Sequence, residues 1–251
     1  THRGSSAASD VYKRQGSDIM SMKTHAKKDG SDWILNGSKH FISGPVMPDF
    51  AIVFASTGED ETPRGKRKRI TAFLVDVGEN GFEIGIGTKC VSYRGYHAFR
   101  LNFSDVRLGP NQILGEEGKG LELSGKWLGM GRIWVGASCC GKAERLFGLA
   151  KDWASTRKQF GQPIGKFQAT GFKLADIAIE LRAADLMVND AVRRANEGKM
   201  SDADAAMVKV YCSEMLNRAA DNTLQLYGGM GLMEELPIQR LWRDSRLERI
   251  W

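Results

Sequence analysis

Hydrophobic residues follow two different periods along the 251 residues of this chain. Between Trp33 and Val106 the apolar runs are short, rich in β-branched and aromatic residues, and separated by turn residues, which is typical of β-strands. After Gly115 the apolar residues recur every three or four positions, as on one face of an α-helix. The pattern predicts a β domain followed by a helical domain, with the boundary between Val106 and Gly118.

The first part of the chain contains short segments with strand character. The Asn36-Gly37 pair favours a tight hairpin turn between two of them, because these residues readily adopt positive φ values. The charged stretch 59–69 predicts an exposed loop between two buried, paired strands. Strands at this spacing predict a compact antiparallel barrel or sandwich. We expect them at residues 33–35, 39–43, 51–55, 70–75, 82–84 and 99–103.

The second part of the chain predicts four antiparallel helices. Gly198 ends the second helix, because glycine tolerates the left-handed conformation found after helix C-termini. Ser201, followed three positions later by Asp204, predicts the start of the third helix through a capping box. The glycine-rich segment 228–231 interrupts that helix, and Pro237 suits the first turn of the fourth. The first two helices are expected at 121–151 and 167–196.

Charge and composition narrow the possible partners. Lys and Arg number 36 against 30 Asp and Glu, a net charge of +6, and this mild excess fits a small anionic ligand at least as well as nucleic acid. No apolar run approaches the roughly 20 residues that a membrane span requires. We therefore expect no nucleic-acid partner and no membrane span. Four cysteines without C-x-x-C spacing predict reduced core residues: Cys90, Cys139, Cys140 and Cys212.

The amino-terminal residues 1–15 have neither apolar periodicity nor capping residues. They resemble the translation of a sequencing adapter, so we expect a leader that is foreign to the fold. The chain then divides into this leader, a β domain at 16–112 and a helical domain at 113–251. The fold class is α+β, an antiparallel β-barrel domain followed by a four-helix bundle.

Three segments have residues suited to a cofactor, and each also has a plainer explanation. Arg157, which begins the segment 157–161, could bind a pyrophosphate bidentately, although a basic helix terminus beside a glycine is a common cap. The glycines of 225–231 would let the backbone approach a ligand closely, or would simply end a helix. The strand end 41–44 combines an aromatic plane with a hydroxyl group, which suits a flat heterocycle or ordinary core packing.

Other motifs give weaker signals. The segment 115–120 has the glycines of a phosphate loop, but Glu116 and Glu117 would repel phosphate, so a linker is favoured. No metal-ligand spacing appears among the histidines. The chain also lacks the H-E-x-x-H, P-loop and G-x-S-x-G motifs of the corresponding enzyme classes.

Eight short motifs, in their order along the chain and at their separations, resemble those of the acyl-CoA dehydrogenase family of flavoproteins. The similarity is collinear from Gly16 to Trp251. It implies FAD-dependent α,β-dehydrogenation of an acyl-CoA thioester to the 2-enoyl-CoA, in a fragment that lacks the family's N-terminal helical domain and is inactive alone. The matching motifs lie at 16–18, 36–43, 72–75, 103–106, 114–120, 157–161, 227–231 and 243–246.

The resemblance also implies which residues hold FAD. Phe41 would lie against the flavin ring, where the family often has tryptophan, and Ser43 would replace a usual threonine near flavin N5. Arg157 would reach the pyrophosphate of a neighbouring subunit's FAD, so a homo-oligomer, dimer or tetramer, is expected. The full set is Phe41, Ile42, Ser43, Arg157, Gln159, Phe160, Gln168, Gln225, Gly228 and Gly229.

For the substrate, the resemblance implies contacts from Ser17, Arg132 and Trp251. It assigns no catalytic residue within the chain, because in most members the glutamate that removes the α proton directly follows the position of Trp251. Some branches place it before the arginine matched by Arg132, where this chain has Gly131. The acidic pair 234–235 is expected in an exposed turn instead.

Two rival functions stay open at this point. A flavin monooxygenase or a nitroalkane-type oxidase would use the same fold, and a non-catalytic scaffold would have kept the fold without the cofactor. For the dehydrogenase, the resemblance implies an electron-transfer flavoprotein as electron acceptor. It also implies location in a bacterial cytoplasm or, in a eukaryote, the mitochondrial matrix.

Overall fold

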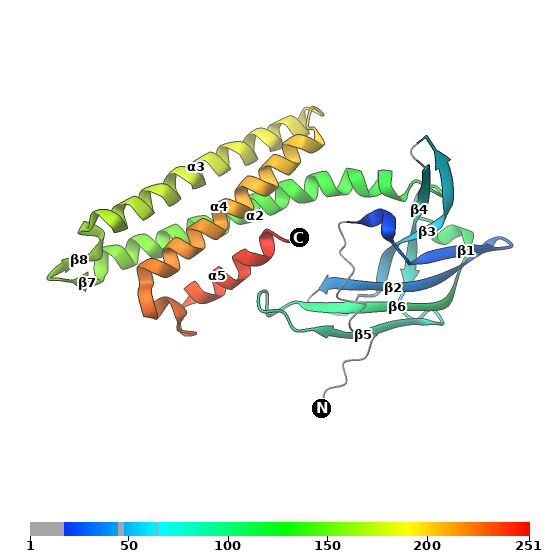
Figure 1. The fold of residues 1–251 in the computed structure, drawn as a ribbon, viewed down its shortest axis with the longest axis horizontal. Helices are drawn as coiled ribbons and strands as arrows, with labels where there is room; N and C mark the ends of the chain where they lie inside the picture. The colour runs from blue at the N-terminus through cyan, green and yellow to red at the C-terminus, as the bar shows by residue number, and fades with distance from the viewer. Residues whose placement is uncertain (1–17, 45–47, 64) are drawn as a thin grey trace. The chain divides into compact units, whose positions relative to one another are not determined.

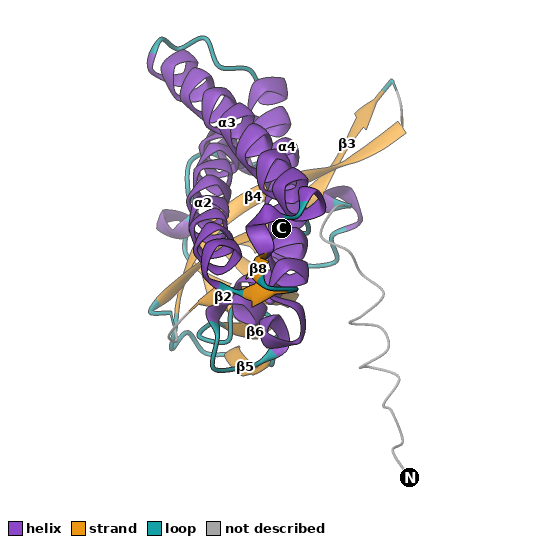
Figure 2. Cartoon of the chain, turned by 90° about the vertical axis from the view of Figure 1, so that its left-hand side faces the viewer, coloured by secondary structure: helices purple, strands orange, loops and turns teal. Residues whose placement is uncertain are grey.

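The computed structural model describes residues 18–44, 48–63 and 65–251. Two compact units make up this part of the chain. The β unit contains the described residues up to 90 together with 94–125, and the helical unit contains 91–93 and 126–251. The large sheet belongs to the β unit and the bundle to the helical unit (Figures 1 and 2). The predicted leader at 1–15 lies outside the described residues.

The β unit is built on one six-stranded sheet in the order β4-β3-β1-β2-β6-β5. The α+β class and the order of a β part before a helical part are confirmed, but two details differ from the expected barrel. Strand β1 pairs with β3 in parallel, so the sheet is mixed, and β4 and β5 form its two edges. The strands are β1 (His25–Asp29), β2 (Asp32–Gly44), β3 (Phe50–Thr62), β4 (Gly65–Asp76), β5 (Phe82–Thr88) and β6 (His97–Leu108).

The core of the β unit lies on one face of this curled sheet. Alternate side chains of the central strands are buried there, as the period of two predicts. Trp33 and Phe73 meet edge to face with ring centroids 5.8 Å apart. The largest members of the core are Trp33, Leu35, Val53, Phe73, Leu101, Phe103 and Leu108.

The hairpin turn predicted at Asn36-Gly37 is wrong, because β2 runs straight through this pair. Asn36 instead makes two side-chain hydrogen bonds with Asp105 of β6: its Nδ2 donates to Asp105 Oδ1 (2.9 Å), and its Oδ1 accepts from Asp105 N (3.0 Å). The register between β2 and β6 shifts here, so the pair forms a bulge within a continuous strand. The turn itself lies one strand earlier, at Gly30 between β1 and β2, where φ is +64°.

The charged stretch 59–69 forms more strand than the sequence predicts. Strands β3 and β4 pair as expected, and their ladder continues outward to Thr62 and Gly65. Arg69 Nε donates to Asp60 Oδ1 across the strands (3.0 Å). Opposite charges on facing strands stabilise the extension, although exposed ion pairs contribute little each.

The helical unit consists of four helices with a shared core. Ser201 and Asp204 form the predicted capping box: Asp204 N donates to Ser201 Oγ (3.1 Å), and Ser201 N donates to Asp204 Oδ2 (2.9 Å). Pro237 opens the last helix, as predicted. The helices are α2 (Gly120–Thr156), α3 (Gln168–Asn196), α4 (Asp202–Tyr227) and α5 (Pro237–Glu248).

Three of the four cysteines lie in the core of this bundle, as expected: Cys139, Cys140 and Cys212 are buried. The prediction is wrong for Cys90, which is exposed after the end of β5. The acidic pair 234–235 is exposed in a turn, as expected. None of the helices that the structure describes is long and apolar enough to cross a membrane.

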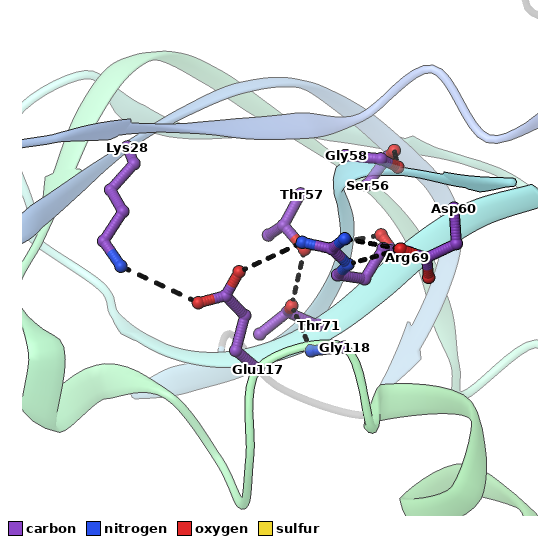
Figure 3. Close-up of polar contacts among 9 residues, drawn as sticks. All are labelled: Lys28, Ser56, Thr57, Gly58, Asp60, Arg69, Thr71, Glu117 and Gly118. Atoms are coloured by element: carbon purple, nitrogen blue, oxygen red, sulfur yellow. Dashed lines mark hydrogen bonds and ion pairs between the residues drawn. The ribbon is translucent and has the colours of Figure 1, made fainter.

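The segment 115–120, expected as a linker, connects β6 to α2, but both it and the preceding Leu114 are hydrogen-bonded to strand β4 (Figure 3). Leu114 N donates to Ala72 O (2.9 Å), and Gly118 N donates to Thr71 Oγ1 (2.9 Å). A Cβ at Gly120 would lie 2.9 Å from the carbonyl oxygen of Ile70, so glycine permits this close approach. The start of α2 is therefore held against the sheet by backbone contacts.

Two charged side chains support this attachment from the strands. Glu117 Oε1 lies 3.6 Å from Arg69 Nη1, and Glu117 Oε2 lies 3.8 Å from Lys28 Nζ (Figure 3). Thr71, which accepts from Gly118, also shares a hydrogen bond of 2.8 Å between its Oγ1 and Thr57 Oγ1. The side chains in both ion pairs are partly exposed, so these pairs contribute little to the stability of the attachment. Glu117 thus has a structural partner and is not directed at an anionic ligand.

Replacing Gly37 by alanine should destabilise the β unit more than the same change at Gly30. Gly37 has φ +129°, and an added Cβ would lie 2.7 Å from Thr24 Cα, whereas a Cβ at Gly30 meets nothing within 4 Å. We expect Gly37→Ala to lower the free energy of unfolding by about 2–4 kcal/mol and Gly30→Ala by about 1 kcal/mol. Urea denaturation measures both, and equal losses would contradict the bulge.

Candidate functional site

The ends of α2 and α4 form a groove of about 580 Å³ in the helical unit. We call it the helix-end groove. Four of the residues predicted to bind FAD line it together: Arg157, Gln159, Gly228 and Gly229. Its other lining residues are Trp153, Ile164, Leu226, Tyr227, Met230 and Met233.

Arg157 owes its place to a short hairpin that follows α2. Its backbone N–H donates to Trp153 O (2.8 Å), and its carbonyl oxygen accepts from Ile164 N (2.8 Å). Directly after Arg157, strands β7 (Lys158–Gln159) and β8 (Gln162–Pro163) pair with each other. The two residues between the strands, Phe160 and Gly161, have φ of +51° and +79°, as a tight hairpin turn with two left-handed residues requires.

The floor of the groove is aromatic. Trp153 and Tyr227 stack with ring centroids 4.5 Å apart and an interplanar angle of 12°, and the Arg157 guanidinium lies 5.9 Å from the Trp153 ring. Tyr227 OH donates to Leu149 O (3.0 Å), and burial raises the pKa of this phenol. Tyr227 therefore stays neutral and serves as a fixed support for the Trp153 ring.

The glycines leave open space at the other wall of the groove. Gly228 ends α4 with φ +60° and ψ −141°, and its N–H caps the carbonyl oxygen of Gln225. A Cβ at Gly228 or Gly229 would meet no atom within 4 Å. Packing inside this chain does not demand these glycines, so the wall has room for a ligand close to its backbone.

The groove has the chemistry of a site for a ligand that is both anionic and planar. Among the described residues, none of the ion pairs involves Arg157, which is exposed. A guanidinium offers a planar set of donors that matches phosphate oxygens bidentately. The aromatic floor and the open glycine wall accept flat or extended groups, so the residues present fit a dinucleotide.

Three further residues of the predicted FAD set belong to the helical unit but lie outside the lining of this groove. Phe160 is 92% exposed at the hairpin tip, edge-on to Phe167. Gln168 is the exposed first residue of α3, and Gln225 is exposed in the last turn of α4. Their predicted roles therefore stay predictions.

The predicted flavin-contacting segment forms the end of β2 in the β unit. Phe41 is 63% exposed with φ +59°, and the register between β2 and β6 shifts beside it. Ser43 Oγ donates to Phe41 O (3.3 Å), while Ile42 packs against the core. Positive φ costs a non-glycine residue free energy, and such strain concentrates at functional sites. The segment thus presents an aromatic ring and a hydroxyl on its exposed face.

The predicted substrate residues have different settings. Ser17 lies outside the described residues. Arg132 is partly buried on α2, and Trp251 follows α5, with its ring edge-on to that of Trp134 at 6.0 Å. The indole Nε1 of Trp251 donates to Glu248 Oε2 (2.7 Å).

Sequence reasoning missed Glu248, which is completely buried in the last turn of α5. It forms hydrogen bonds with Lys142, Tyr93 and Trp251, and we call these four residues the Glu248 cluster. The only signal in the sequence is that Asp244 and Glu248 lie four residues apart, on one face of α5. Asp244 Oδ1 accepts from Tyr93 N (2.7 Å).

Stability of the β unit should depend on pH through Lys39 of β2. Burial lowers the pKa of Lys39 from 10.5 to about 8. Between these two values the unfolded chain holds a proton that the folded chain lacks, so the free energy of unfolding rises with pH there. At pH 7 the charge of this partly buried side chain costs stability, and Lys39→Met should raise the free energy of unfolding by about 1–2 kcal/mol.

Urea denaturation at pH 7 and at pH 9.5 tests this dependence on Lys39. The gain in stability between the two pH values should be larger in the wild type than in Lys39→Met. An equal gain in both proteins would show that another group titrates.

Replacing Gly228 by alanine should cost more stability than replacing Gly229. The φ and ψ of Gly228 suit only glycine, whereas Gly229 has no positive φ and open space at its Cβ position. We expect Gly228→Ala to lower the free energy of unfolding by about 1–3 kcal/mol and Gly229→Ala to change it by well under about 1 kcal/mol. Guanidinium denaturation of the two variants is the measurement, and a larger loss for Gly229→Ala would contradict the geometry.

Comparison with known proteins agrees with this arrangement over almost the whole chain. A model of the acyl-CoA dehydrogenase middle domain matches residues 7–106, and a model of the C-terminal domain matches 118–251. The chain is 36% identical over 236 residues to 3-(aryl)acrylate reductase of Clostridium sporogenes, covering 94% of this chain and 62% of the relative.

Solved structures show the same relationship. Butyryl-CoA dehydrogenase from Megasphaera elsdenii matches with a TM-score of 0.87 and 36% identity, covering 94% of this chain and 61% of that one. An acyl-CoA dehydrogenase from Bacillus anthracis, complexed with FAD, matches with a TM-score of 0.85 and 29% identity, covering 94% and 43%. The chain thus spans less than two thirds of the length of these proteins. With both domain models matched in order, the chain belongs to the acyl-CoA dehydrogenase family.

Proposed function

We propose that the chain is the middle and C-terminal part of an FAD-dependent acyl-CoA dehydrogenase, which converts an acyl-CoA thioester into the 2-enoyl-CoA. The observation that carries the proposal is the helix-end groove. The groove combines Arg157, which has no ion-pair partner among the described residues, with open space beside Gly228 and Gly229. A member of the same family, from Bacillus anthracis, is complexed with FAD. Bound FAD supplies the acceptor for the hydride that leaves the β carbon.

Each unit contributes residues suited to one part of the cofactor. Arg157 would pair with the pyrophosphate through its guanidinium, and the open backbone at 228–229 would allow close approach. In the β unit, the exposed ring of Phe41 would cover the isoalloxazine, and the Ser43 hydroxyl would hydrogen-bond near its N5. In a dimer or tetramer, Arg157 would serve the FAD of a neighbouring copy.

The proton chemistry needs a carboxylate that can reach the α carbon. Glu248 does not qualify, because it is buried and both its oxygens accept hydrogen bonds. The exposed acids at 234–235 lie in a turn outside the groove. In the family pattern the glutamate directly follows the residue matched by Trp251, and we place the general base there.

The remaining roles follow from the same proposal. Trp251 would contact the acyl portion of the substrate, and Ser17 and Arg132 would contact the CoA thioester portion. Electron-transfer flavoprotein would reoxidise the flavin, and the enzyme would act in a bacterial cytoplasm or a mitochondrial matrix. The net charge of +6 is favourable for attracting the phosphates of CoA.

The decisive experiment uses the full-length protein that contains this chain. Purified protein should show the visible absorbance of oxidised flavin, and saturated acyl-CoA added without oxygen should bleach it while the 2-enoyl product appears in the mass spectrum. Absence of flavin would favour a scaffold. Product formation that requires oxygen would favour a monooxygenase or a nitroalkane-type oxidase.

Arg157→Ala should weaken FAD binding, whereas Lys158→Ala should not. Both changes remove one positive charge from an exposed residue of the same segment, but only Arg157 lines the helix-end groove. Losing a charge-assisted, bidentate contact should raise the Kd for FAD at least about tenfold. Titration of the apoprotein with FAD measures both values. Equal effects would mean that Arg157 acts only through general charge.

A further inference from the structure

Glu248 is a carboxylate removed completely from water at the end of α5. Burying a carboxylate is costly unless charged and polar groups compensate it. Here the ammonium group of Lys142, from α2, and the hydroxyl of Tyr93 both donate to its Oε1. Lys142 also donates to the Tyr93 hydroxyl, so three groups share one closed network.

The second oxygen of this carboxylate has a different partner. Oε2 accepts the hydrogen bond from Nε1 of Trp251 at 2.7 Å. This indole is 52% exposed, and its ring also meets Trp134 at an interplanar angle of 78°. An exposed aromatic side chain is therefore fixed at its N–H by a buried charge and at its ring by a second indole.

The backbone around Trp251 is held as well. Trp251 N donates to Leu247 O (3.2 Å), which continues the helical turn beyond the last residue of α5. One turn before Glu248, Asp244 accepts from Tyr93 N (2.7 Å). Hydrogen bonds therefore hold the chain on both sides of Glu248, at Asp244 and at Trp251. A carboxylate held in this way can fix the orientation of the indole.

We propose that Glu248 is a positioning residue that orients Trp251 toward the acyl group of the substrate. This role rests on the proposed function, in which Trp251 contacts the acyl-CoA. The structure gives Glu248 no route to the substrate itself, since both oxygens are occupied and the side chain is buried.

Glu248→Gln separates positioning from packing, because the amide has nearly the same volume. The ammonium of Lys142 and the hydroxyl of Tyr93 demand an acceptor, so the amide oxygen takes the place of Oε1. The amide NH2 then faces the indole N–H of Trp251, donor against donor. The substitution removes the hydrogen bond that orients the indole.

Tyr93→Phe is the matched control. It removes a different donor from the same carboxylate and leaves the contact between Glu248 Oε2 and Trp251 in place. Trp251→Phe removes the indole donor and retains an aromatic ring. If Glu248→Gln fails to fold, Trp251→Phe alone still tests the need for the indole hydrogen bond, through its effect on KM.

The first measurement does not depend on activity. The FAD-loaded full-length protein is labelled with 5-fluorotryptophan, and Trp251→Phe identifies the 19F resonance of Trp251. We expect Glu248→Gln to shift or broaden this resonance and Tyr93→Phe to leave it close to the wild type. An unchanged resonance in Glu248→Gln would overturn the positioning role, even in a protein without turnover.

The second measurement is steady-state kinetics with straight-chain saturated acyl-CoA thioesters. Glu248→Gln and Trp251→Phe should each raise KM about tenfold with a smaller change in kcat, and the double variant should add little to either. Unchanged KM in Trp251→Phe, or fully multiplied effects in the double variant, would overturn the inference. A wild type that does not turn over these thioesters would contradict the proposed function instead.

Discussion

Burial of the apolar faces of α2, α3 and α4 against one another is the constraint on which the helix-end groove depends. Leu146, Ile177 and Met215 are almost completely removed from water, and each contributes roughly 1.5–3 kcal/mol through its apolar surface. Once these helices pack in register, the end of α2 lies beside the end of α4, and Trp153 stacks on Tyr227. The packing of the helices therefore places Arg157 in the same groove as Gly228 and Gly229.

Backbone conformations that L-residues avoid occur where the proposed site needs an unusual shape. Phe41 and Phe160 both have positive φ, and Gly228 adopts a conformation that suits only glycine. The surrounding hydrogen bonds hold these conformations: a shifted ladder beside Phe41, a two-stranded hairpin at Phe160, and a helix cap at Gly228. Such conformations cost free energy and concentrate at functional sites.

The chain uses charge in two physically different ways. Pairs such as Arg69 with Asp60 lie at the surface, where water screens them and each contributes little. Glu248 and Lys142 pair where water is excluded from the carboxylate, so removal of either partner leaves an expensive uncompensated charge. The surface pair adds a little stability to the hairpin of β3 and β4. The buried pair holds neighbouring side chains in place, including the exposed indole of Trp251.

Local patterns in the sequence determined the α+β class, the helices and their caps, because Ser201 and Pro237 act on atoms within one turn of themselves. They also indicated Arg157 and the glycines at 228–229, since these residue types have unusual donors or unusual freedom. Only the tertiary structure decided that Asn36 forms a bulge rather than a turn, because its partner Asp105 is 69 residues away. The same holds for Glu248, whose burial comes from Lys142 and Tyr93, distant in sequence, and contacts of this range leave no period or spacing in a single chain.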